Sequence, residues 1–112
     1  KEEEAVSYNL AFKMPDNDPS KTATLSEDLS RLYSELLGKY PILSIEDPFA
    51  REDAKAFAAF TGTVGDDVQV VGDELLASNA ERVDAAVEHK RANAVLLKLT
   101  QVGTVTEALT VV

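Results

Sequence analysis

The sequence predicts an α/β fold in which about three parallel strands alternate with helices and form an arc of a (β/α)8 barrel. The first observation is that helical periodicity and short apolar runs alternate along the chain from residue 25 onward. The second is that the apolar runs end in charged residues, namely Glu46, Asp73 and Lys98. The third is that these residues recur roughly every 26 positions, about the length of one strand–helix unit. Closing a barrel takes eight strands, so three consecutive βα units make only part of one.

The leading region, residues 1–24, gives only weak signals. Residues 6–12 are compatible with a short strand, and Pro15–Ser20 is rich in proline, aspartate and asparagine, which favours a loop. The incomplete barrel domain is therefore expected to comprise residues 25–112. It begins with an amphipathic helix over 26–38, which Ser26 can cap at its start and Gly38 at its end. Its apolar stripe consists of Leu25, Leu29, Leu32, Tyr33, Leu36 and Leu37.

The stretch YPILSIEDP, residues 40–48, predicts the first strand of the sheet, over Ile42–Ile45. Its apolar side chains suit a parallel strand that is covered on both faces. Glu46 and Asp47 follow directly. Burying an unpaired carboxylate costs several kcal/mol, so we expect both at the open carboxyl end of the strand. A helix is expected from about residue 50 to residue 60, with Asp47 near its start.

Two further strands are expected, over Val68–Val71 and Ala94–Leu97. Asn79 is a suitable N-cap for the helix between them, which we expect to reach about residue 91. This helix is expected to bury Val83, Ala86 and Val87. A last helix should begin near residue 102. The chain stops within it, at TEALTVV, with no capping residue, which indicates a segment of a longer protein.

Composition excludes several classes of function. The 112 residues are 45% hydrophobic, enough for the packed core of one domain or a piece of one. The formal net charge of −9 argues against nucleic acid or an anionic membrane as a partner, because both bind basic surfaces. No apolar run approaches the ~20 residues that cross a bilayer, and the first residues lack the hydrophobic region of a signal peptide. The absence of cysteine excludes disulfides and thiolate metal sites, and it fits a cytoplasmic location.

The charged strand ends suggest a specific chemistry. Carboxylates such as those of Glu46 and Asp73 provide the oxygen ligands that Mg²⁺ prefers, and this ion commonly takes only a few of them from a protein. A lysine beside such a cation, here Lys98, is expected to have a lowered pKa and can act as a general base. The cation would then stabilise the enolate that forms when a proton is removed next to a carboxylate. Asp47 and Glu74 are expected to support the site or a helix start, because neighbouring strand residues point to opposite faces.

Spacing alone leaves a structural alternative open. Glu46, Asp73 and Lys98 could form an ion-pair network that closes the open end of the sheet without taking part in catalysis. Both interpretations place the three side chains in the same mouth of the sheet. The single histidine, His89, falls among charged residues of a predicted helix, where a solvated surface position is expected.

Three segments of the chain resemble, in this order and at this spacing, consecutive segments of enolase. They are YPILSIEDPF, VQVVGDELLASNAERV and NAVLLKLTQVGTVTEAL. The likeness extends more loosely to YNLAFK and LSEDLSRLYSELLGKYP, so it covers nearly the whole chain from about Tyr8. The resemblance implies that these residues are the middle of the TIM-like barrel that forms the C-terminal domain of enolase.

Enolase interconverts 2-phosphoglycerate and phosphoenolpyruvate, in glycolysis and gluconeogenesis, with two Mg²⁺ ions. By this resemblance, Glu46 in SIEDP and Asp73 in VVGDE correspond to magnesium ligands, and Lys98 in LLKLTQ corresponds to the base that takes the C2 proton. The first metal-binding aspartate, the acid-side glutamates and the phosphate-binding arginine would lie outside these residues. The segment alone is therefore expected to be inactive. The complete protein would be a homodimer, as enolases commonly are, or part of a larger assembly.

Two departures from the family pattern adjoin the expected site. Glu74 stands where the family usually has a second aspartate, and Thr100 precedes Gln101 where the family usually has Asn-Gln. A longer Glu74 could shift the carboxylate of Asp73, and a shift of about 1 Å can cost about a hundredfold in rate. Gln101 is expected to support the site. The alternatives are a catalytically weakened, enolase-like structural or interaction subunit of a larger assembly, or another member of the wider enolase superfamily.

Overall fold

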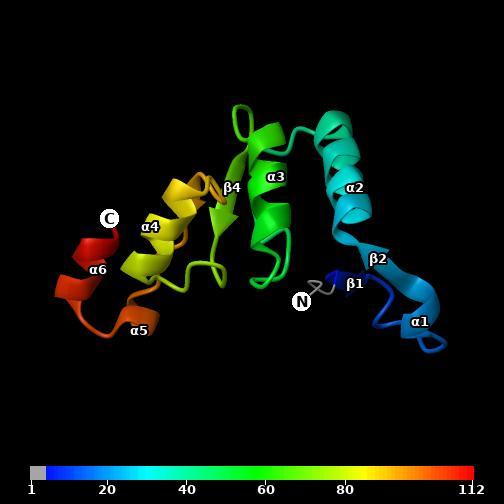
Figure 1. Ribbon diagram of the computed structural model, residues 1–112, viewed down its shortest axis with the longest axis horizontal. Coiled ribbons are helices and arrows are strands. Elements are labelled where there is room, and N and C mark those ends of the chain that lie inside the picture. The colour runs from blue at the N-terminus through cyan, green and yellow to red at the C-terminus, as the bar shows by residue number, and fades with distance from the viewer. Residues whose placement is uncertain (1–4) are drawn as a thin grey trace. The chain divides into compact units, whose positions relative to one another are not determined.

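The computed structural model describes residues 5–112, and the chain divides into two compact units, residues 1–40 and 41–112. In the first unit, strands β1 (Ser7–Asn9) and β2 (Ala23–Leu25) pair in antiparallel fashion. Helix α1 (Pro19–Thr22) lies in their connection, and helix α2 (Ser26–Lys39) follows β2 directly (Figure 1). The loop that we predicted over Pro15–Ser20 is therefore wrong in its last residues.

Capping explains the start of α1 but not that of α2, whose N-cap is Leu25 without a side-chain hydrogen bond; the prediction that Ser26 caps this helix is therefore wrong. Asp18 accepts a hydrogen bond from the backbone N–H of Ser20, and a proline suits the first helical position, so a short helix forms where a loop was expected. Helix α2 confirms the predicted amphipathic helix, and its Leu29 is buried, at 2% exposure. Gly38 lies inside α2 instead of capping it, and the N–H of Tyr40 donates to the carbonyl of Leu36 at the helix end.

The second unit is built on a parallel sheet in the order β3–β4–β5. Its strands are β3 (Ser44–Glu46), β4 (Gln69–Gly72) and β5 (Ala94–Val95). Its helices are α3 (Ala54–Val64), α4 (Ala80–Glu88), α5 (Leu99–Val102) and α6 (Val105–Val111). Helix α3 connects β3 to β4, and α4 connects β4 to β5. This alternation around a parallel sheet confirms the predicted α/β class.

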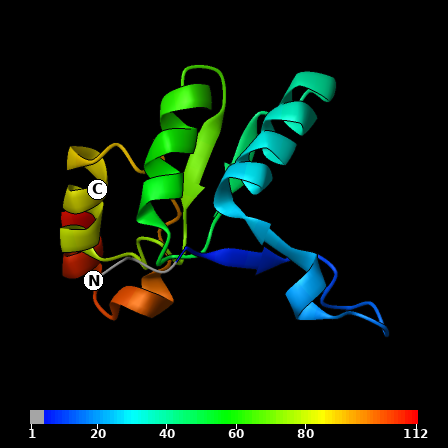
Figure 2. The same ribbon diagram turned by 45° about the vertical axis from the view of Figure 1, so that its right-hand side comes forward.

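Aromatic residues of α3 and of the segment before it form the core of the second unit. The ring of Phe49 meets those of Phe57 and Phe60 edge-on, at centroid distances of 5.7 and 5.6 Å. All three rings are almost completely buried, as is Val70 in the central strand. Figures 1 and 2 both show α3 lying beside β4. The central strand and α3 therefore carry the packing that supports the edge of the sheet described below.

Asn93 fastens the start of the central strand to the segment before β5. Its side-chain oxygen accepts a hydrogen bond from the backbone N–H of Val70, at 2.6 Å. Its amide nitrogen donates to the carbonyl oxygens of Gly65 and Val68, both at 3.0 Å. One side chain thus satisfies three backbone groups that would otherwise lack partners near the strand.

The strand β3 differs from its prediction in position and in burial. Pairing with β4 begins where the N–H of Gln69 donates to the carbonyl of Leu43, so the strand starts at Ser44 and not at Ile42. Leu43 is 79% exposed and Ile42 36%. The expectation that both faces of this strand are covered is therefore wrong. The two exposed residues lie before the start of β3, which has β4 as its one strand neighbour among residues 5–112.

The helices of the second unit show three further differences. Helix α3 starts later than expected, because Asp53 is its N-cap, so the expectation that Asp47 lies at the helix start is wrong. Helix α4 has the predicted N-cap, but it ends early, at Glu88, and Val87 is 70% exposed instead of buried. The last helix begins at Val105 instead of near residue 102, and a short helix that we did not predict, α5, ends just before Gly103, whose φ of 94° is in the region that favours glycine. None of the helices within residues 5–112 combines the length and the apolar character needed to cross a membrane.

Candidate active site

The carboxyl ends of the three parallel strands lie at one edge of the sheet. Glu46, the last residue of β3, is in register with Val71 of β4, and Gly72 is in register with Val95 of β5. The chain leaves β4 directly into Asp73, and it leaves β5 through Leu96 and Leu97 to Lys98, which precedes the first residue of α5. Glu46, Asp73 and Lys98 therefore all lie at the carboxyl ends of neighbouring parallel strands.

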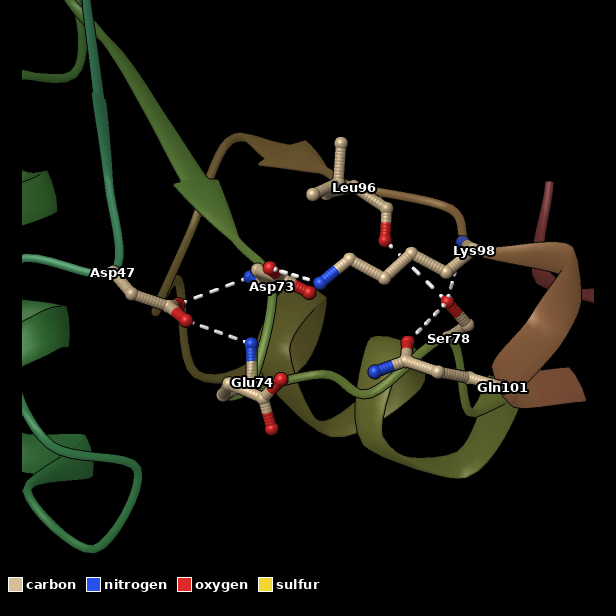
Figure 3. A network of polar contacts seen from close by, with 7 residues as sticks. All are labelled: Asp47, Asp73, Glu74, Ser78, Leu96, Lys98 and Gln101. Carbon is tan, nitrogen blue, oxygen red and sulfur yellow. Dashed lines mark hydrogen bonds and ion pairs between the residues drawn. The ribbon is translucent and has the colours of Figure 1, made fainter.

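An ion pair joins two of the predicted site residues (Figure 3). The ammonium nitrogen of Lys98 lies 2.5 Å from Oδ2 of Asp73. The Asp73 side chain is buried, at 9% exposure, whereas that of Lys98 is 37% exposed. The expected convergence of these two side chains is confirmed. Whether they serve as metal ligand and base stays a prediction.

The second carboxylate oxygen of Asp73 has no hydrogen-bond partner among residues 5–112. Oδ1 is buried, and no hydrogen-bond donor reaches it within residues 5–112. Buried polar atoms in folded proteins are almost always hydrogen-bonded, so an unpartnered one requires an explanation such as an ion. The fold thus presents an unused anionic oxygen next to the Lys98 ammonium.

The charges around Lys98 raise its pKa above the ordinary value of a lysine. The hydrogen bond from the ammonium to Asp73 is the main cause; partial desolvation opposes it, and the fields of Asp73, Glu74 and Glu46 add to it. The lowered pKa that we predicted for Lys98 beside a bound cation stays a prediction, since the raised value results from the protein groups alone. Glu46 and Glu74 are themselves exposed, and both act on Lys98 through space.

This shift predicts a loss of stability at alkaline pH. Because the pKa of Lys98 is higher in the folded state, the ion pair contributes fully below the ordinary value near 10.5 and is lost as the pH rises through the folded value. We expect the urea midpoint of the intact protein to fall above pH ~10.5. Burial also raises the pKa of Tyr33, so the measurement compares wild type with Lys98→Met to isolate the contribution of Lys98. Superimposable alkaline profiles of the two proteins would contradict the prediction.

Asp47 joins the ends of β3 and β4. Its carboxylate oxygens accept hydrogen bonds from the backbone N–H groups of Asp73, at 3.0 Å, and of Glu74, at 2.7 Å (Figure 3). Its own N–H donates to the carbonyl of Val71, and its φ of 39° is unusual for a residue other than glycine. Charge-assisted bonds of this kind are roughly twice as strong as neutral ones. Asp47 therefore fixes the backbone from which the Asp73 side chain leaves.

The remaining polar contacts of this edge involve one residue that sequence reasoning missed. The hydroxyl of Ser78 accepts a hydrogen bond from the backbone N–H of Lys98, and it also contacts Gln101. The side chain of Gln101, which we expected to support the site, contacts this serine, and the backbone N–H of Gln101 donates to the carbonyl of Lys98. No sequence signal singles out Ser78, because an isolated serine before a helix cap is common in loops.

A comparison with known protein families decides the identity of this fold. The family model described as the enolase C-terminal TIM barrel domain matches residues 1–112. The chain belongs to the enolase family. The resemblance seen in the SIEDP, VVGDE and LLKLTQ segments is thereby confirmed, and the parallel sheet with its helices is part of an enolase-type barrel.

A divalent cation at the carboxyl edge of the sheet would require oxygen ligands from the protein. Within the described part of the chain, no three carboxylate, histidine or cysteine side chains are grouped so that they could hold a metal. Mg²⁺ is commonly held by one or two carboxylates, with water and substrate as the other ligands. The unpartnered Oδ1 of Asp73 is one such donor, and Glu46 is a second carboxylate close enough to act on Lys98. The donor chemistry of this edge therefore fits Mg²⁺.

Proposed function

We propose that these residues belong to an enolase that interconverts 2-phosphoglycerate and phosphoenolpyruvate, with Lys98 as the base that takes the C2 proton. The observation that carries the proposal is the contact between the Lys98 ammonium and the buried carboxylate of Asp73. The two groups come from successive strands and meet at the carboxyl edge of the sheet, which is the face of (β/α)8 barrels that carries active sites. Membership of the enolase family supports the choice of reaction.

The raised pKa of Lys98 fits the state of the base after it has taken the C2 proton. The structure favours the ammonium form, which is the form that the base takes once it has accepted a proton. Asp73 stabilises that form directly, at 2.5 Å. A base works best when its pKa is near the operating pH, and any neutralisation of Asp73, Glu74 or Glu46 would bring the pKa of Lys98 down toward it. The partial exposure of the side chain leaves the amine accessible to a substrate.

Two carboxylates would hold the cation in this proposal. Asp73 would contribute its unpartnered oxygen, and Glu46 would contribute the carboxylate at the end of β3. Bound there, Mg²⁺ would supply the positive charge that stabilises the anion left when the C2 proton is removed. Asp47 would keep the Asp73 backbone in place while this happens, through its two hydrogen bonds.

The proposed function is tested by turnover in the intact protein. We expect 2-phosphoglycerate to be converted to phosphoenolpyruvate, conversion to stop after a chelator removes divalent cations, and addition of Mg²⁺ to restore it. Calcium serves as a control for non-specific cation effects, because its larger and more flexible coordination shell differs from that of Mg²⁺. A folded intact protein without turnover in the presence of Mg²⁺ would overturn the proposal. The ion pair of Asp73 and Lys98 would then be structural, as in an enolase-like subunit of a larger assembly.

A further inference from the structure

We infer that Ser78 is a positioning residue for Lys98, and that Gln101 orients the serine hydroxyl for this purpose. The inference rests on the proposed function, in which Lys98 is the base. It concerns a different question, namely what holds the lysine in the geometry that proton abstraction requires.

The hydroxyl of Ser78 lies at the centre of a small, partly buried network (Figure 3). Ser78 is 2% exposed, and its Oγ accepts a hydrogen bond from the backbone N–H of Lys98, at 2.8 Å. The same Oγ lies 3.0 Å from Oε1 of Gln101 and 3.4 Å from the carbonyl oxygen of Leu96. The network thus joins the loop between β4 and α4 to the end of β5 and to α5.

The directions of these bonds follow from their donors. A serine hydroxyl has one proton to donate and lone pairs with which to accept. Because the N–H of Lys98 occupies a lone pair, the hydroxyl proton is free to point at an acceptor, and the Gln101 oxygen is closer than that of Leu96. Hydrogen bonds in a chain polarise one another, so the bond from Ser78 to Gln101 strengthens the bond from the Lys98 N–H to Ser78. Gln101 therefore turns the lone pair of Ser78 toward Lys98.

The backbone of Lys98 depends on this bond. The parallel ladder of β5 ends early, and the last bond that it contributes runs from the N–H of Leu96 to the carbonyl of Gly72. The N–H of Lys98 lies beyond the ladder and is held by Ser78. Since the lysine side chain is partly exposed, core packing does not fix it either. Ser78 holds the Lys98 backbone at its N–H, the N–H of Gln101 holds it at its carbonyl, and Asp73 holds the amine.

The loop that carries Ser78 adopts a costly conformation. Ala77 and Ser78 have φ values of 46° and 51°, in the left-handed region that residues with a Cβ seldom adopt. Such outliers persist only where the surroundings enforce them, and they are often found at functional sites. Here the two consecutive left-handed residues bring the serine hydroxyl under the Lys98 backbone just before the cap of α4.

The test compares Ser78→Ala with Ser78→Gly in the intact protein. Both remove the hydroxyl, but glycine also relieves the left-handed strain, so the glycine variant should be the more stable of the two. We expect kcat and the exchange of the C2 proton to fall about 10- to 100-fold in both, with KM within about twofold of wild type. Ala77→Gly is the matched control, because it relieves strain at the neighbouring residue and keeps the hydroxyl; its kcat should equal that of wild type. If activity instead follows stability, with Ser78→Gly near wild type, the inference is overturned.

Hydrogen exchange of the Lys98 amide provides a readout that does not require turnover. We expect protection at this amide to be lost in both Ser78 variants and kept in Ala77→Gly. Unchanged protection in the Ser78 variants would overturn the inference even if their activity fell. A wild-type protein without turnover would overturn the proposed function alone, and the exchange measurement would still decide whether Ser78 anchors Lys98.

Discussion

Replacing Lys98 with methionine is expected to lower turnover of the intact protein about 10²- to 10⁴-fold, the usual contribution of a general base. Methionine keeps the length and the apolar stem of the side chain but has no amine. The variant leaves the buried Asp73 carboxylate without its cation, so we expect lower stability, and turnover is compared under conditions in which the variant is folded. Steady-state kinetics with 2-phosphoglycerate measure the loss, and circular dichroism verifies the fold.

Two companion variants separate a base from an ion-pair partner. Lys98→Arg retains a cation for Asp73, but a guanidinium cannot lose its proton in a protein, so this variant should be as inactive as Lys98→Met. An exclusively structural ion pair predicts the opposite, an arginine variant with wild-type properties. Lys39→Met is the control for the chemistry of the substitution, since Lys39 lies exposed at the end of α2; its turnover should match wild type. Near-normal turnover of Lys98→Arg would contradict the base assignment.

Replacing Phe57 with alanine is expected to destabilise the protein by about 3–5 kcal/mol, as is usual for a large buried ring. Phe57 has no exposed surface and meets the ring of Phe49 edge-on at 5.7 Å. Its removal leaves a cavity beside α3 that the surrounding side chains can fill only partly. Urea unfolding of the intact protein, with activity as a second probe of the folded state, measures the effect.

The matched control applies the same substitution to an exposed ring. Phe12 is 67% exposed and lies under the ammonium of Lys13, so Phe12→Ala should change the free energy of unfolding by less than about 1 kcal/mol. A similar loss for the two variants would contradict the location of the core. So would a loss below about 1 kcal/mol for Phe57→Ala.

The order of elements was predictable from local signals. The periodic leucines predicted α2, and the apolar runs that end in a charged residue predicted the three strands. The wrong predictions concern burial, which depends on residues that are close in space but distant in the sequence. Leu43 and Val87 are apolar, so burial was expected, yet one precedes an edge strand and the other faces away from the core. Capping also moved the start of α3, because Asp53 competes with the earlier Asp47 as the N-cap.

The charged residues of the candidate site were predictable from the sequence, but the hydrogen bonds that hold them were not. Equivalent places at parallel strand ends brought Asp73 and Lys98 together, as the spacing indicated. The rise in the pKa of Lys98 caused by the protein groups depends on how close the carboxylates come to the amine, and spacing in the sequence does not give that distance. Ser78 was missed because its bond to Lys98 spans two segments that are distant in the sequence, and it relies on a left-handed backbone that no pattern of side chains reveals.

The most direct measurement of the central claim is the exchange of the C2 proton of 2-phosphoglycerate with solvent deuterium. This exchange isolates proton abstraction from the later departure of the hydroxyl group. We predict that the intact wild-type protein exchanges the proton and that Lys98→Met and Lys98→Arg bind the substrate without exchanging it. Exchange at the wild-type rate in either variant would contradict the account, because the amine beside Asp73 would then not be the base.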